Sequence, residues 1–165
     1  MKTLTVISLS AITVLGLALP LSSSVAQQGS LRQQLVGTWT VVSDEIVTPS
    51  GTKQGPSGPN PKGILMMDAG GRYATMGGKS DRPKLKSGNR SEVTAQEFGT
   101  AAMDFAANYG TWTVNEAEKT VTMHREGALN PNNEGTDVKV SVSLAGDELK
   151  GVGPGGRTFV YRRAK

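Results

Sequence analysis

Apolar and polar residues alternate with a period of two along much of this chain, a pattern typical of β-strands with one buried face. The clearest alternation covers residues 136–144, where valines and a leucine are separated by lysine and serine. Segments rich in glycine, proline and asparagine separate the alternating runs and predict turns or loops. The pattern predicts eight strands, over residues 35–42, 63–68, 72–76, 111–114, 120–126, 136–144, 148–152 and 157–163.

Short turns join most of these predicted strands. Residues 69–71 (Ala-Gly-Gly), for example, supply the positive φ angles that a tight reversal needs. Antiparallel strands joined in this way favour a closed up-and-down barrel, because closure leaves no unpaired edge. At eight strands the interior is either filled by side chains or holds one small ligand. We expect a mainly β fold, an eight-stranded antiparallel up-and-down barrel over residues 35–165, with a β-sandwich as the alternative.

One segment in the middle of the chain has the period of a helix instead. Residues 94–97 (Thr-Ala-Gln-Glu) fit a capping box, in which the threonine and glutamate side chains satisfy free backbone amides. Phe98 begins an apolar stripe that continues at i+3, i+4 and i+7, where it reaches Phe105. The pattern predicts one helix inserted mid-chain, which faces the body of the protein with this stripe and ends at Tyr109 and Gly110.

The first residues have the features of a secretory signal peptide. Lys2 precedes an apolar run over residues 4–19, and Pro20 ends that run before it reaches the length of a membrane span. Small residues at the third-last and last positions before the expected cut, Ser24 and Ala26, fit the requirement of signal peptidase. We expect cleavage after Ala26, so that residues 1–26 are removed and the protein is exported to the periplasm or the external medium.

Composition excludes several classes of function. The chain has no cysteine, which excludes disulfides, thiolate metal sites and a cysteine nucleophile. Residues 27–34 form a polar leader, and no later apolar run predicts stable membrane insertion. Loss of Lys2 with the signal peptide lowers the net charge from +4 to +3. The basic cluster over residues 79–90 lacks stacking aromatics, so nucleic acid is not an expected partner.

Several motifs resemble a known family. Gly37-Thr38-Trp39 is similar to the Gly-X-Trp signature of lipocalins, whose tryptophan closes the barrel base beneath an arginine of the last strand. By this resemblance Arg162 or Arg163 would cover Trp39. A longer series resembles the bacterial and fungal lipocalin-like domain family, at residues 58–65, 68, 71–73, 81–83, 87–90, 109–111, 124, 126–127 and 135–137.

The resemblance implies a cup-shaped barrel that binds a small, mostly apolar molecule. Our leading hypothesis is therefore an exported protein that binds a hydrophobic or amphipathic small molecule and needs no cofactor. The chain lacks the disulfides of broader lipocalins and places its helix mid-chain, so no ligand preference is carried over. The oligomeric state is not indicated. Two alternatives remain, a barrel isomerase or cyclase and a ligand-free structural protein of the cell envelope.

His124 and Glu126 are the candidate acid and base of the enzyme alternative. His124 is the one histidine of the chain, and it shares a strand face with Glu126 about 7 Å away at the usual strand rise. If this face points into the barrel, the pair binds a hydroxyl or carboxylate, or moves a proton. Two other arrangements remain open, an inward histidine with a purely structural hydrogen bond and a solvent-exposed pair. A single histidine without neighbouring ligands does not predict a zinc site.

Other candidate ligand contacts are arginines and aromatic residues. Arg82 and Arg90 lie in a predicted loop near the barrel mouth, where a guanidinium binds a carboxylate with two parallel hydrogen bonds. The alternative is that both are solvent-facing loop charges. Tyr73, Tyr109 and Trp112 are expected either to line the cavity or to belong to an ordinary core.

Overall fold

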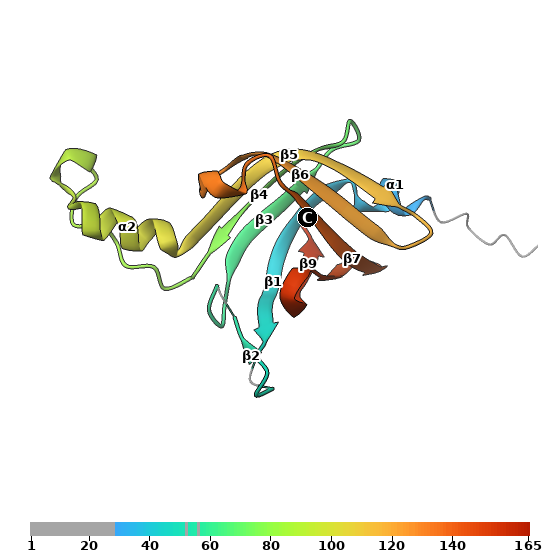
Figure 1. The fold of residues 1–165 in the computed structure, drawn as a ribbon, viewed down its shortest axis with the longest axis horizontal. Coiled ribbons are helices and arrows are strands. Elements are labelled where there is room, and N and C mark those ends of the chain that lie inside the picture. The colour runs from blue at the N-terminus through green and yellow to red at the C-terminus, as the bar shows by residue number, and fades with distance from the viewer. Residues whose placement is uncertain (1–28, 52, 56) are drawn as a thin grey trace, which may run out of the picture.

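The computed structural model describes residues 29–51, 53–55 and 57–165 (Figure 1). The predicted signal peptide, including the cleavage site after Ala26, lies outside the described residues. None of the helices in the described part of the chain is long and apolar enough to span a bilayer.

Antiparallel strands form one continuous sheet, in which each strand from β3 to β8 pairs with the next along the chain. Three 3-10 turns lie in the connections: η1 (Arg90–Glu92), η2 (Pro131–Asn133) and η3 (Pro154–Gly156). The strands are β1 (Gly37–Val47), β2 (Lys53–Gln54), β3 (Lys62–Met67), β4 (Arg72–Gly78), β5 (Phe105–Asn115), β6 (Thr120–Ala128), β7 (Asp137–Ala145), β8 (Glu148–Val152) and β9 (Arg157–Arg163).

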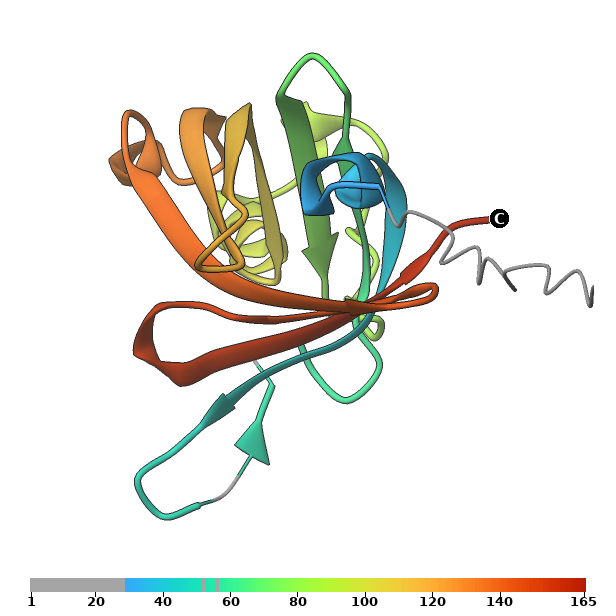
Figure 2. The same ribbon diagram turned by 90° about the vertical axis from the view of Figure 1, so that its right-hand side faces the viewer.

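β1 closes this sheet into a barrel because it pairs with β3 on one side and β9 on the other. The pairing with β9 runs from Trp39 opposite Arg163 to Ile46 opposite Arg157, with a register shift between Val41 and Ser43. Figure 2 shows the strands curving around a common interior. The predicted eight-stranded barrel is confirmed, and the short β2 only forms a hairpin with the far end of β1.

A short helix, α1 (Leu31–Leu35), lies across one end of the barrel, in a segment for which the sequence predicts only a polar leader and the start of a strand (Figures 1 and 2). Ser30 and Gln33 form a capping box at its start. The backbone amides of Leu31 and Arg32 donate to the Glu116 carboxylate at 2.9 and 3.0 Å. These bonds fix α1 to the β5–β6 turn, so this end of the barrel is covered.

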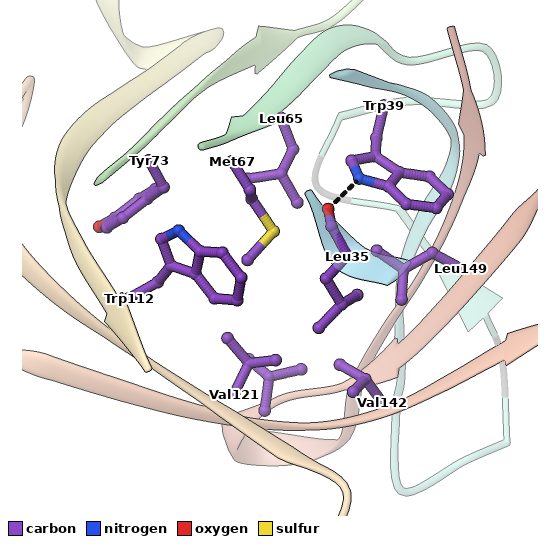
Figure 3. Packing of buried hydrophobic residues seen from close by; sticks show 10 residues of the cluster. Leu35, Trp39, Leu65, Met67, Tyr73, Trp112, Val121, Val142 and Leu149 are labelled. Atoms are coloured by element: carbon purple, nitrogen blue, oxygen red, sulfur yellow. Dashed lines mark hydrogen bonds between the residues drawn. The ribbon is translucent and has the colours of Figure 1, made fainter. Parts of the chain in front are cut away.

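The hydrophobic core fills the half of the barrel next to α1. Leu35 and Trp39 are fully buried, and the Trp39 Nε1–H donates to the Leu35 carbonyl at 2.9 Å. Figure 3 shows these side chains converging on the interior from α1 and the surrounding strands. The buried apolar residues are Leu35, Trp39, Leu65, Met67, Tyr73, Trp112, Val121, Val140, Val142 and Leu149.

The inserted helix differs from the prediction in length and in direction. α2 (Ala95–Met103) has the predicted capping box at Thr94 and Glu97, but it ends six residues early because Phe105 already begins β5. β5 pairs with β4 from Phe105 onward and with β6 from Asn108 onward, and this pairing overrides the helical pattern. The expected contact between the apolar stripe and the barrel is also wrong, since α2 has no buried residue and projects away from it (Figure 1).

Candidate functional site

A cavity of about 330 Å³ occupies the half of the barrel opposite α1. Its walls come from strand segments at the open end of the barrel, next to the point where α2 leaves it. The inward-facing side chains of the lining are Val41, Asp44, Leu65, Tyr73, Thr75, Asn108, Met123, Arg125, Val138, Val140, Arg157, Phe159 and Tyr161.

Small residues in β3 and β4 help to keep this space open. Gly63 and Gly77 face each other across the two strands and both line the cavity. A Cβ atom on Gly63 would lie 2.6 Å from the Met76 carbonyl oxygen and 2.8 Å from the Cα of Gly77. A side chain at either position would crowd backbone atoms of the neighbouring strand.

An ion pair borders the cavity at the end of β1. The Arg157 guanidinium holds both carboxylate oxygens of Asp44, with Nε to Oδ1 at 2.6 Å, and Ser57 Oγ donates to the same carboxylate at 3.1 Å. The hydrogen bond to Asp44 raises the pKa of Arg157 despite its partial burial. Such a two-pronged pair is geometrically specific. The ion pair holds β1 and β9 together beside the cavity, and the Asp44 carboxylate neutralises the charge of Arg157.

Two tyrosines bring hydroxyl groups into the cavity. The Tyr73 hydroxyl donates to Asn108 Oδ1 at 2.8 Å, and the Tyr161 ring packs edge-on against Phe159. Burial raises the pKa of Tyr161, and the nearby negative charge of Asp44 acts in the same direction. Burial also raises the pKa of Tyr73, against the opposing effect of the Arg125 guanidinium. Both phenols are therefore neutral hydrogen-bonding groups at physiological pH.

Arg125, near the end of β6, is a second arginine of the cavity wall. Its Nη1 donates to Thr136 Oγ1 at 3.1 Å, and its charge acts on the neighbouring Tyr73 hydroxyl. The ion pairs found among the described residues do not include it. Arg125 thus differs from Arg157, whose charge is matched by a carboxylate.

The structure does not bring His124 and Glu126 into the cavity. Both side chains are exposed on the outer face of β6, because the inward positions of this strand are taken by Val121, Met123 and Arg125. The His124 ring lies 2.7 Å from an Asp137 carboxylate oxygen. Glu126 accepts two hydrogen bonds from Arg72 at 2.6 and 2.8 Å, and these bonds lower the pKa of Glu126. Of the three arrangements that the sequence leaves open, the structure has the solvent-exposed pair.

The other candidate ligand contacts separate into inside and outside positions. Tyr73 lines the cavity, whereas Trp112 is buried in the core below it and Tyr109 is 52% exposed. Arg82 donates to the Ala101 carbonyl and lies over the Phe105 ring, and Arg90 lies over the Phe98 ring. The two arginines therefore stabilise the α2 region, and neither reaches the cavity.

The closed end of the barrel contains the residues that the resemblance assigned to closure. The Arg163 guanidinium lies 4.2 Å from the centre of the Trp39 ring and donates to the carbonyls of Gln34 and Val36 at 2.6 and 3.0 Å. Gly37 has a φ of 137°, and a Cβ atom there would lie 2.9 Å from Arg163 Nη1. Arg162 is exposed on the other face of β9, so Arg163 is the arginine that covers Trp39.

Sequence reasoning missed most of the polar groups of the cavity, of which Arg125 is the clearest example. Alternation along β6 places Arg125 on the same face as Val121 and Met123, which is the apolar face of that strand. In a barrel with a single layer, the apolar face points inward. The alternation along β6 is visible in the sequence alone. It predicts that Arg125 points into the barrel and that His124 points outward.

The described residues contain no cluster of three or more histidine, aspartate or glutamate side chains that would hold a metal ion.

Comparison with protein families finds a match to a lipocalin-like domain over residues 36–153. No curated protein matches the chain. The matched region includes all strands except the last and contains every inward-facing group named above other than those of β9.

Proposed function

Because the chain belongs to the lipocalin-like domain family, and because its barrel keeps an interior cavity, we propose that it binds a small hydrophobic or amphipathic molecule inside the barrel. The observation that carries this proposal is the cavity of about 330 Å³ with mixed walls. Ligand sites usually have about 300–1,000 Å³ and apolar walls with a few placed polar groups. This cavity is at the small end of that range, which favours a small molecule over a long lipid.

The same geometry supports binding over the two alternatives. A ligand-free structural barrel has its interior filled by side chains, whereas here the core occupies only the half next to α1. The isomerase or cyclase hypothesis relied on His124 and Glu126, which face away from the cavity. Binding is therefore the function that these residues support best.

Filling the cavity tests the proposal. N-phenyl-1-naphthylamine, a neutral probe whose fluorescence rises in apolar sites, should bind the wild-type protein. Val138→Trp adds an indole to the cavity wall, so we expect the affinity for the probe to fall by at least about tenfold, or about 1.4 kcal/mol. The matched control is Ser141→Trp, which adds the same indole to the exposed face of β7 and should leave the affinity unchanged.

Two results would contradict the binding proposal. One is the absence of probe binding to folded wild-type protein. The other is an equal affinity of the Val138→Trp and wild-type proteins for the probe, since the probe would then bind outside the barrel. Circular dichroism of each variant separates loss of binding from loss of the fold.

Export is the second part of the proposal and rests on residues 1–26 alone. A signal peptide over these residues places the mature binding protein outside the cytoplasm, in the periplasm or the medium. Mass spectrometry of the mature protein, isolated from the organism that makes it, should find an N-terminal peptide that begins at Gln27. An intact peptide that spans residues 20–30 in the isolated protein would contradict the proposed cleavage after Ala26.

A further inference from the structure

The cavity carries an excess of positive charge. Three basic residues border it, Lys62, Arg125 and Arg157, against one acidic residue, Asp44. Arg157 is paired with Asp44, so these two charges compensate each other. Lys62 lies at the rim with an exposed side chain. Arg125 is thus the inward-facing charge without a carboxylate partner among the described residues.

The surroundings of Arg125 are suited to an oxyanion. A guanidinium has five N–H donors in a planar fork that matches the oxygens of a carboxylate or phosphate. One terminal nitrogen of Arg125 is engaged by Thr136, and among the described contacts its remaining donors have no side-chain acceptor. The Asn108 oxygen accepts from Tyr73, which leaves the Asn108 amide group as a further donor in the same wall.

The remaining wall is apolar and suits the rest of such a ligand. Met123 precedes Arg125 by two positions on β6, and Val138 and Val140 lie on the neighbouring β7. A hydrocarbon chain or ring against these residues would leave its charged head within reach of Arg125.

We propose that the cavity selects amphipathic anions, and that Arg125 binds their oxyanion head group. The proposal rests on the function proposed above and specifies its ligand class. It assigns the head group to Arg125 because the other inward arginine is already occupied by Asp44. Neutral molecules of the same shape would bind through the apolar wall alone.

Two ligands that differ in the head group test this assignment by isothermal titration calorimetry. Octanoate and octan-1-ol share a chain length, and octanoate should bind the wild-type protein about tenfold to a hundredfold more tightly, as expected for charge-assisted hydrogen bonds. Arg125→Met should abolish the preference, because octanoate then loses its charged partner and binds no more tightly than octan-1-ol. Arg125→Lys should restore part of the preference, because it returns the charge without the fork.

The matched control is Arg162→Met, which removes the same charge from the exposed face of β9 and should leave the preference intact. If Arg125→Met does not fold, Arg125→Gln replaces it. Equal affinities of the wild-type protein for the two ligands, or an undiminished preference in folded Arg125 variants, would overturn the assignment while the binding function stands. If neither ligand nor the neutral naphthylamine probe binds, the proposed function fails together with the assignment.

Discussion

At the residue scale, the side chains that face the interior change in character from one end of the barrel to the other. Next to α1 they are apolar and closely packed around Trp39, which Arg163 covers from β9. Toward the open end, hydroxyl, amide and guanidinium groups appear between apolar residues. Each of these polar groups requires a partner, because an unsatisfied buried group costs about 1–3 kcal/mol. Asp44 with Arg157, and Tyr73 with Asn108, show how that requirement is met.

Because of Tyr161, the barrel should lose stability when the pH becomes alkaline. Burial raises the pKa of Tyr161 above its ordinary value in the unfolded chain, where it is about 10. The contribution of this residue is therefore fully present below about pH 10 and is lost as the pH rises toward the folded-state pKa, because only the unfolded chain then releases its proton. Tyr73 shifts in the same direction.

We expect Tyr161→Phe to flatten this dependence. Urea unfolding at pH 8 and at pH 10.5 should give a smaller loss of unfolding free energy in the variant than in the wild-type protein. Tyr73 and Lys79, whose pKa values are also raised, remain in both proteins and contribute to the dependence that persists. An identical loss in the two proteins would show that Tyr161 ionises as readily in the folded barrel as in the unfolded chain.

At the scale of elements, α1 and α2 have opposite relations to the barrel. α1 is bound to Glu116 and buries Leu35 in the core. α2 buries nothing, and the contacts that order its surroundings are local, such as Arg90 over Phe98. Segments with few buried contacts open at low free energy, independently of the global fold. The α2 region should therefore behave as a separate, less stable unit.

Gly99→Ala tests the independence of α2. No atom lies within 4 Å of a Cβ at Gly99, so the methyl group fits, and alanine favours the helix by about 1 kcal/mol. Hydrogen exchange measured by mass spectrometry should slow about fivefold in α2 and stay unchanged in the barrel strands. A matching rise in the melting temperature of the whole barrel would mean that α2 and the barrel unfold together.

Prediction from the sequence succeeded where local pattern and tertiary pairing agree. Alternation over residues 136–144 matches β7, and the reversal predicted at residues 69–71 is present, with a φ of 89° at Gly71. It failed at Phe105, whose helical spacing from Phe98 is overridden by its pairing with Gly78 of β4. For the site, alternation places His124 and Arg125 on opposite faces of their strand. It does not predict which residues meet across different strands. The Asp44–Arg157 pair, 113 positions apart, follows only from barrel closure.

At the scale of the whole molecule, the barrel is closed at one end and hollow at the other. α1, Trp39 and Arg163 close the first end, and the cavity opens at the second, where α2 leaves the barrel. This arrangement stabilises the fold through one half of the interior while the other half remains available to a ligand. It explains how a domain without cysteine combines a packed core with an interior cavity.

The most direct test of this account is to locate a ligand within the barrel. Intermolecular NOE spectroscopy on methyl-labelled protein with octanoate should give contacts between the hydrocarbon chain and the methyl groups of Met123, Val138 and Val140, all of which line the cavity. NOEs confined to exposed methyl groups such as those of Met103 and Leu129, or no NOE at saturating octanoate, would contradict the claim that the barrel interior is the binding site.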